Sequence, residues 1–172
     1  MNGLRHCIEH ELGRLVGQPL QTMGRAADMA WLGFGPLIEV PNRARGGSRT
    51  IPRYSIHLQC PFRLQGPQDT LVAAHDMYYS AISPADTSDS FEWDHQGASL
   101  YDARVAVLRH QLEHRALVVS AVIADDAGGF RLALNADYAF EVFPATSFHQ
   151  EHWRFFARDS DAPHFVVFDE DG

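Results

Sequence analysis

The sequence predicts an α+β fold in which two amphipathic helices pack on a single twisted antiparallel β-sheet. Three observations support this prediction. Apolar residues recur at helical spacing over residues 2–16 and 100–114, and residues 54–64 alternate between apolar and other side chains. The C-terminal part consists of short apolar runs separated by turn residues, which is typical of an antiparallel meander. No internal repeat or linker interrupts the chain, so we expect one globular domain over residues 1–172.

The N-terminal part is expected to begin with a helix over residues 2–16, which ends at Gly17. A turn through Gly24 then leads to a strand over residues 27–34. A second short strand follows over residues 37–40.

An arginine-rich loop is expected over residues 41–53, and the next strand over residues 54–64. This strand directs its apolar side chains to one face and its polar side chains to the other. Because Pro61 cannot donate a ladder hydrogen bond, we expect the strand to lie at a sheet edge or to bulge there. A strand over residues 70–74 is expected to pair with it across a Gly-Pro turn.

An acidic loop over residues 80–97 carries Trp93 and precedes the second helix, residues 100–114. Ser99 and Asp102 form a capping-box-like start for this helix. The remaining strands are expected over residues 117–124, 130–134, 138–143, 152–157 and 164–168.

The charged residues exclude several classes of function. All fourteen basic residues are arginine, so a P-loop, a protein-kinase site and Schiff-base chemistry, which need a lysine, cannot be built. Arginine instead suits bidentate contacts to carboxylates and stacking on aromatic rings. The formal net charge of −8 argues against nucleic-acid binding and fits a protein with a basic partner.

The compartment is expected to be the cytoplasm. Cys7 and Cys60 are far apart and have no metal-ligand spacing, and there is no signal peptide. No apolar run is long enough to span a membrane, so we expect no membrane contact. No dinucleotide fingerprint or serine-nucleophile elbow occurs, and we expect no cofactor.

A metal-binding motif occurs twice. Residues 6–10 and 110–114 both have the pattern H-x-x-E-H, which places two histidines on one helix face beside a carboxylate. Both pairs lie opposite the apolar stripe of their helix, where a solvated surface is expected. We therefore expect no metal site, and we keep His110 and His114 as the metal-ligand candidates.

The polar face of residues 54–64 contains His57, Gln59 and Arg63, and His75-Asp76 follows the neighbouring strand. A histidine beside an aspartate can act as a base, and an arginine can hold a carboxylate or phosphate. A polar row is also ordinary on a half-solvated antiparallel sheet. These residues therefore fit three alternatives, an ordinary solvated sheet face, a contact to a ligand or partner, and catalysis.

Residues 24–29, 54–63 and 142–154 resemble an uncharacterised family of small bacterial proteins. The resemblance implies a single domain and a bacterial cytoplasm, and it implies no activity. The pattern Phe-x-Val-x-Pro at residues 140–144, followed by Glu-x-Trp at residues 151–153, is also similar to immunity-type proteins of bacterial toxin systems. That second resemblance implies neutralisation of a toxin through an acidic surface with aromatic anchors.

The sequence thus favours a non-enzymatic bacterial binding protein, an immunity or accessory factor, whose partner is a basic toxin or another basic protein. One alternative is a small-ligand or metal-dependent enzyme that uses a His/Arg/Asp cluster or an H-x-x-E-H pair. Another is an oligomeric module that pairs through the edge of residues 54–64. No catalytic residue is assigned, and the candidate binding residues are Arg25, Asp28, His57, Gln59, Arg63, His75, Asp76, Trp93, Glu151, Trp153 and Arg154.

Overall fold

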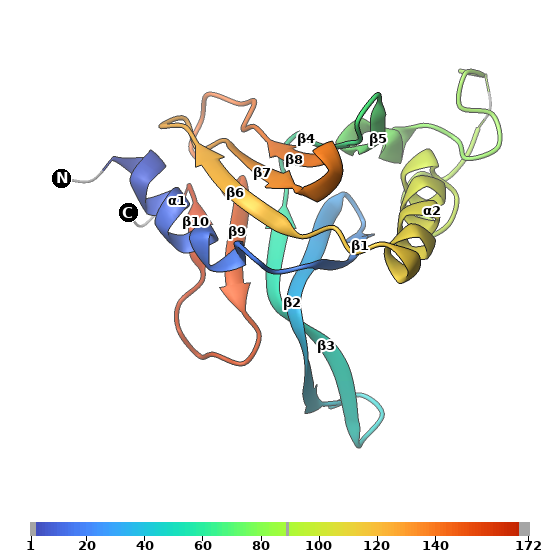
Figure 1. Ribbon diagram of the computed structural model, residues 1–172. Helices are drawn as coiled ribbons and strands as arrows, with labels where there is room; N and C mark the ends of the chain where they lie inside the picture. The colour runs from blue at the N-terminus through green and yellow to red at the C-terminus, as the bar shows by residue number, and fades with distance from the viewer. Residues whose placement is uncertain (1–2, 89, 169–172) are drawn as a thin grey trace.

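The computed structural model describes residues 3–88 and 90–168, and it shows two β-sheets (Figure 1). In this described part, each sheet has five antiparallel strands, and there are two α-helices. The prediction of one sheet covered by two helices is therefore wrong, and the fold is mostly sheet.

Sheet I has the strand order β1-β2-β3-β9-β10. Its strands are β1 (Leu20–Ala26), β2 (Met29–Pro41), β3 (Ser48–Leu58), β9 (Trp153–Ala157) and β10 (Phe165–Val167). The β2–β3 hairpin is long and extends beyond the rest of the sheet (Figure 1). Much of the predicted arginine-rich loop is therefore strand, because β3 begins at Ser48.

The first turn of sheet I lies later than predicted. Ala27, between β1 and β2, has a φ of 52° in the left-handed region, and the chain reverses there. Gly24, the predicted turn residue, lies inside β1, where an added Cβ would come within 2.3 Å of the Trp31 ring. The two strands predicted over residues 27–40 are one strand, β2, with a register shift between Phe34 and Leu37.

Sheet II has the strand order β5-β4-β8-β7-β6. Its strands are β4 (Phe62–Gln65), β5 (Thr70–Ala73), β6 (Val119–Ala124), β7 (Phe130–Leu134) and β8 (Ala139–Val142). The pairing of β4 with β5 across the Gly-Pro turn is confirmed. The predicted strands after residue 117 are also found, with β9 and β10 in sheet I.

The predicted strand over residues 54–64 is divided between the two sheets. Its first part is β3, which ends at Leu58, and its second part is β4, which begins at Phe62. Neither part is an edge strand, because β3 lies between β2 and β9 and β4 lies between β5 and β8. The expected edge position is wrong, and residues 54–58 and 62–65 have no free strand edge through which two copies could pair.

Both sheets contribute to one hydrophobic core. Trp153 of β9 is completely buried, and its ring lies 4.7 Å from the Phe130 ring of β7 in the other sheet. The Trp153 indole Nε1 donates to the Gly128 carbonyl at 2.8 Å. Between β3 and β4 the chain crosses from sheet I to sheet II. Apolar side chains on either side of this crossing face the common core, so the alternation continues from β3 into β4.

The two helices lie at different ends of the fold rather than on one face (Figure 1). α1 (Leu4–Leu12) contacts β6, whereas α2 (Leu100–His114) contacts β1, β5 and the short 3-10 helix η2 (Ala74–Tyr78). The bounds of α2 and its capping box are as predicted. Asn2, the predicted start of the first helix, lies outside the described residues. No helix in the described part has the length and apolar content needed to cross a membrane.

Candidate functional site

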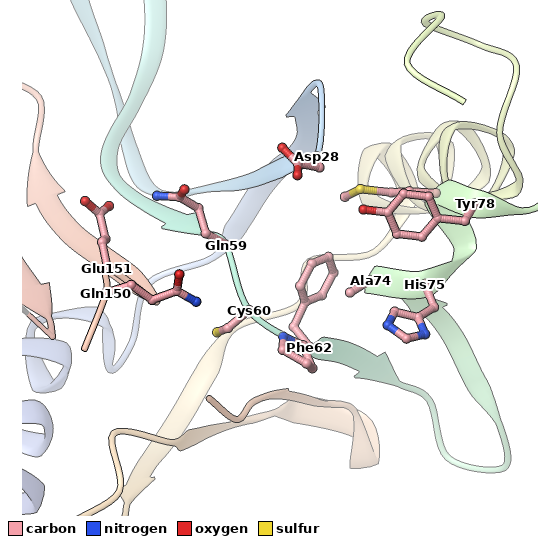
Figure 2. Close-up of a pocket in the computed structure, with 11 residues that line it drawn as sticks. Asp28, Gln59, Cys60, Phe62, Ala74, His75, Tyr78, Gln150 and Glu151 are labelled. Atoms are coloured by element: carbon pink, nitrogen blue, oxygen red, sulfur yellow. The ribbon is translucent and has the colours of Figure 1, made fainter. Parts of the chain in front are cut away.

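A cleft of about 320 Å³ lies where the chain crosses from sheet I to sheet II (Figure 2). Asp28 comes from the β1–β2 turn, and Gln59 comes from the crossing segment. His75 and Tyr78 come from η2, and Glu151 comes from the segment before β9. The fold therefore brings together four of the predicted residues, Asp28, Gln59, His75 and Glu151, which lie far apart in the sequence.

Asp28 supplies a free negative charge to this cleft. It is exposed, and its carboxylate forms no ion pair within the described residues. The left-handed conformation of Ala27 places Asp28 in a tight turn, directly before β2. An exposed carboxylate without a counter-charge can accept hydrogen bonds from a cationic group.

Glu151 is held by Arg154, which lies three residues later in β9. The Nε atom of Arg154 donates to the Glu151 carboxylate at 2.5 Å, and its Nη2 atom donates to the other oxygen. These hydrogen bonds lower the pKa of Glu151, which therefore stays ionised near neutral pH. The charge of Glu151 is offset by Arg154, whereas the charge of Asp28 is not.

Aromatic side chains extend one wall of the cleft. The Tyr78 ring is half exposed and lies 5.3 Å from the Trp93 ring, which belongs to the acidic loop. The His75 ring lies 6.2 Å from the Tyr78 ring. Trp93 was predicted as a binding residue, and the structure places it beside Tyr78 rather than in the cleft lining.

Cys60 lines the cleft but is a poor nucleophile. Its side chain is almost fully buried, and this burial raises the pKa of the thiol to about 12. The reactive form of cysteine is the thiolate. Near neutral pH, Cys60 is therefore a neutral, apolar part of the cleft floor.

The other members of the predicted polar row lie elsewhere. His57 is on the outer face of sheet I, with its ring 4.9 Å from the Phe156 ring. Arg63 lies in sheet II and pairs with Glu141. Asp76 accepts a hydrogen bond from the Ala73 backbone at 2.9 Å and thereby caps η2. The structure forms no cluster from His57, Arg63 and Asp76.

Two further predicted residues are buried within the fold. Trp153 belongs to the core. The Arg25 side chain is fully buried and forms a bidentate pair with Asp102, with both N–O distances at 2.7 Å. Neither side chain is exposed to a partner, so we leave both out of the candidate site.

The two H-x-x-E-H motifs differ in their carboxylates. Both histidine pairs are exposed, as predicted. In α1, Glu9 accepts a hydrogen bond from the Ala124 backbone at 3.1 Å and pairs with Arg5. In α2, the ligand atoms of His110, Glu113 and His114 lie within 4.8 Å of one another, so these three residues can hold a metal ion.

Sequence reasoning missed Tyr78 and Gln150, which also line the cleft. Tyr78 follows His75-Asp76 by two residues, so this aromatic neighbour was an available signal. Gln150 lies in an irregular segment, and no local pattern distinguishes it from other polar loop residues.

Comparisons of the chain with protein-family models, curated proteins and solved structures found no match.

Proposed function

We propose that this protein is a non-catalytic binding protein whose cleft receives a basic side chain of a partner protein. The observation that carries the proposal is the free carboxylate of Asp28 in a cleft that also contains the amides of Gln59 and Gln150. Carboxylate and amide oxygens accept hydrogen bonds, and an arginine or lysine side chain has only donors to offer.

The surroundings of the cleft support a cationic ligand. The neighbouring Tyr78 and Trp93 rings offer π-faces to a cation. Glu92 and Asp94 flank Trp93 in the acidic loop, and both are exposed. A basic segment would therefore meet negative charge and aromatic surface on the same side of the cleft.

The arrangement supports binding better than catalysis. A base needs a partner that orients it, and Asp76 is engaged by the Ala73 backbone instead of His75. A nucleophile needs activation, and burial keeps Cys60 protonated. The enzyme hypothesis therefore loses the His/Arg/Asp cluster, which was one of its two candidate sites.

We further propose a basic protein, such as a toxin encoded beside this chain, as the partner in a bacterial cytoplasm. The net charge of −8 supports attraction to a basic protein over a nucleic acid. The resemblance of residues 140–144 and 151–153 to immunity-type proteins supports the role of an immunity or accessory factor.

A titration with peptides tests the proposal. A short arginine-containing peptide is added to ¹⁵N-labelled protein, and we expect shifts of the backbone amides of Asp28, Gln59 and Gln150. An exposed charged contact contributes up to about 1 kcal/mol, so Asp28→Asn should raise the Kd about fivefold.

The matched control is Asp69→Asn, which changes an exposed aspartate in the β4–β5 turn, outside the cleft. This variant should bind the peptide as the unchanged protein does. The proposal fails if a glutamate-containing peptide shifts the same amides equally, or if Asp28→Asn leaves the Kd unchanged.

A further inference from the structure

A second candidate site lies on sheet I, separate from the cleft at the sheet crossing. Two hollows of about 440 and 550 Å³ lie along the β2–β3 hairpin and the end of β9. They share Arg49, Ile51 and Arg158 in their linings, so they are adjacent. Volumes of this size are typical of small-molecule sites.

The arginines that line both hollows carry positive charge without a carboxylate partner among the described residues. Within residues 3–88 and 90–168, no carboxylate forms an ion pair with Arg49 or Arg158, nor with Arg43 in the larger hollow. Asp159, which follows Arg158 in the chain, is paired with Arg53 at 3.0 Å. Burial, and then repulsion from Arg49, lower the pKa of the Arg158 guanidinium.

Arg49 and Arg158 differ from the arginines that form ion pairs within the fold. The structure pairs Arg25, Arg63, Arg131 and Arg154 with carboxylates, and the net charge of −8 leaves acids in excess. Two guanidinium groups near each other repel, and an anion bound to both would remove that repulsion.

The smaller hollow adds an apolar part. Its lining includes Trp31, Pro52 and Gly33, and Gly33 leaves the β2 backbone without a side chain there. His57 lines the same hollow, and burial together with Arg158 and Arg154 lower the pKa of His57. The imidazole is therefore neutral near neutral pH. It can donate a hydrogen bond to a polar group of a ligand or accept one from it.

We propose that this groove binds a small organic anion with a flat apolar body. Its phosphate or carboxylate group contacts Arg49 and Arg158, and its body lies in the hollow lined by Trp31 and Pro52. A polyanion such as a nucleic acid is disfavoured, because the net negative charge of the chain repels it.

Binding is tested with four probes on ¹⁵N-labelled protein: phenyl phosphate, benzoate, inorganic phosphate and phenol. The Trp31 indole signal, assigned by comparison with a Trp31→Phe variant, reports on the apolar part, and the Arg158 amide reports on the charged part. Phenyl phosphate or benzoate should shift both signals, and the tighter of the two identifies the anionic group. Inorganic phosphate and phenol, which each carry half of the ligand, should bind about tenfold more weakly.

Arginine variants test whether Arg49 and Arg158 contact the anionic group of the ligand. Arg49→Gln changes an exposed strand residue and should raise the Kd of the tighter probe about tenfold, and Arg49→Gln/Arg158→Gln should raise it further. Arg45→Gln, in the hairpin loop outside both linings, should leave the Kd unchanged.

Three outcomes would overturn the proposal. The first is an unchanged Kd in Arg49→Gln, and the second is phenol binding as tightly as phenyl phosphate. The third is an oligothymidylate that binds far more tightly than any of the four probes, which would assign the groove to a nucleic acid.

Discussion

Arg25 and Arg158 show how differently single arginines are used in this chain. The buried Arg25 guanidinium donates two hydrogen bonds to Asp102 and two to backbone carbonyl oxygens. Arg158 forms no ion pair with the described residues and contacts the Phe156 ring. Arg25 has used its donors within the fold, whereas Arg158 has donors left for a ligand.

Arg25→Met should lower the free energy of unfolding by about 3 kcal/mol, because it leaves the Asp102 carboxylate near the protein interior without its partner. Chemical denaturation measures this change. The control is Arg131→Met, which removes a more exposed pair with Glu141 and should cost less than about 1 kcal/mol. Equal losses in the two variants would contradict a special role for Arg25.

The chain has no lysine, and several of its other arginines contact aromatic rings. The guanidinium groups of Arg14, Arg53, Arg109, Arg115 and Arg158 lie over aromatic rings. The sequence predicted such stacking from the chemistry of arginine. It could not predict which arginines would lack a carboxylate, because that depends on strands that are distant in the sequence.

Among the elements, those with clear boundary residues were predicted best. α2 has Ser99 at its start, and β7 lies between the Gly128-Gly129 turn and the turn after residue 134. β1 was missed, since Leu20–Ala26 contains an internal glycine and lacks strict alternation. In β1 the tertiary contacts of Gly24 decide the structure, and local propensity does not.

The sheet crossing explains the main error in the fold and the limit of the site prediction. Alternation predicts which side chains of residues 54–64 are buried, and it does so correctly for Ile56 and Leu64. It contains no information on whether the strand continues in one sheet or enters another. Asp28 and Glu151 were both named from the sequence, but their convergence depends on that crossing.

The helix α2 should bind zinc more tightly than α1. Glu113 lies beside His110 and His114 at the helix surface, while Glu9 of α1 is engaged by the Ala124 backbone and Arg5. In calorimetric titrations of untagged protein, His110→Gln should weaken zinc binding and His10→Gln should leave it unchanged. An equal loss in both variants would show that Glu113 gives α2 no advantage.

The two proposed sites prefer ligands of opposite charge. Asp28 at the sheet crossing prefers a cation, and Arg49 with Arg158 on sheet I prefers an anion. Salt screens exposed charges. Both binding reactions should therefore weaken as the ionic strength rises, although their ligands differ in sign.

Three histidines are held neutral by the fold. We therefore expect acid to destabilise the folded protein. Burial lowers the pKa of His57, His152 and His164 below the ordinary value of 6.5, and neighbouring arginines lower it further for His57 and His164. In the unfolded chain these side chains bind a proton near that value, whereas in the folded protein they bind it only at lower pH. Stability is therefore present above the unfolded pKa and is lost as the pH falls from about 6.5 through the lowered folded pKa values.

His152 gives the sharpest test of this dependence. Its ring is buried, and neither ring nitrogen has a hydrogen-bond partner among the described residues. Because an unsatisfied buried polar group is costly, His152→Leu should stabilise the protein by about 1 kcal/mol at neutral pH. Denaturation curves at several pH values should also show a smaller loss of stability between neutral pH and pH 5 for this variant. The same slope in His152→Leu as in the unchanged protein would contradict a neutral, buried His152.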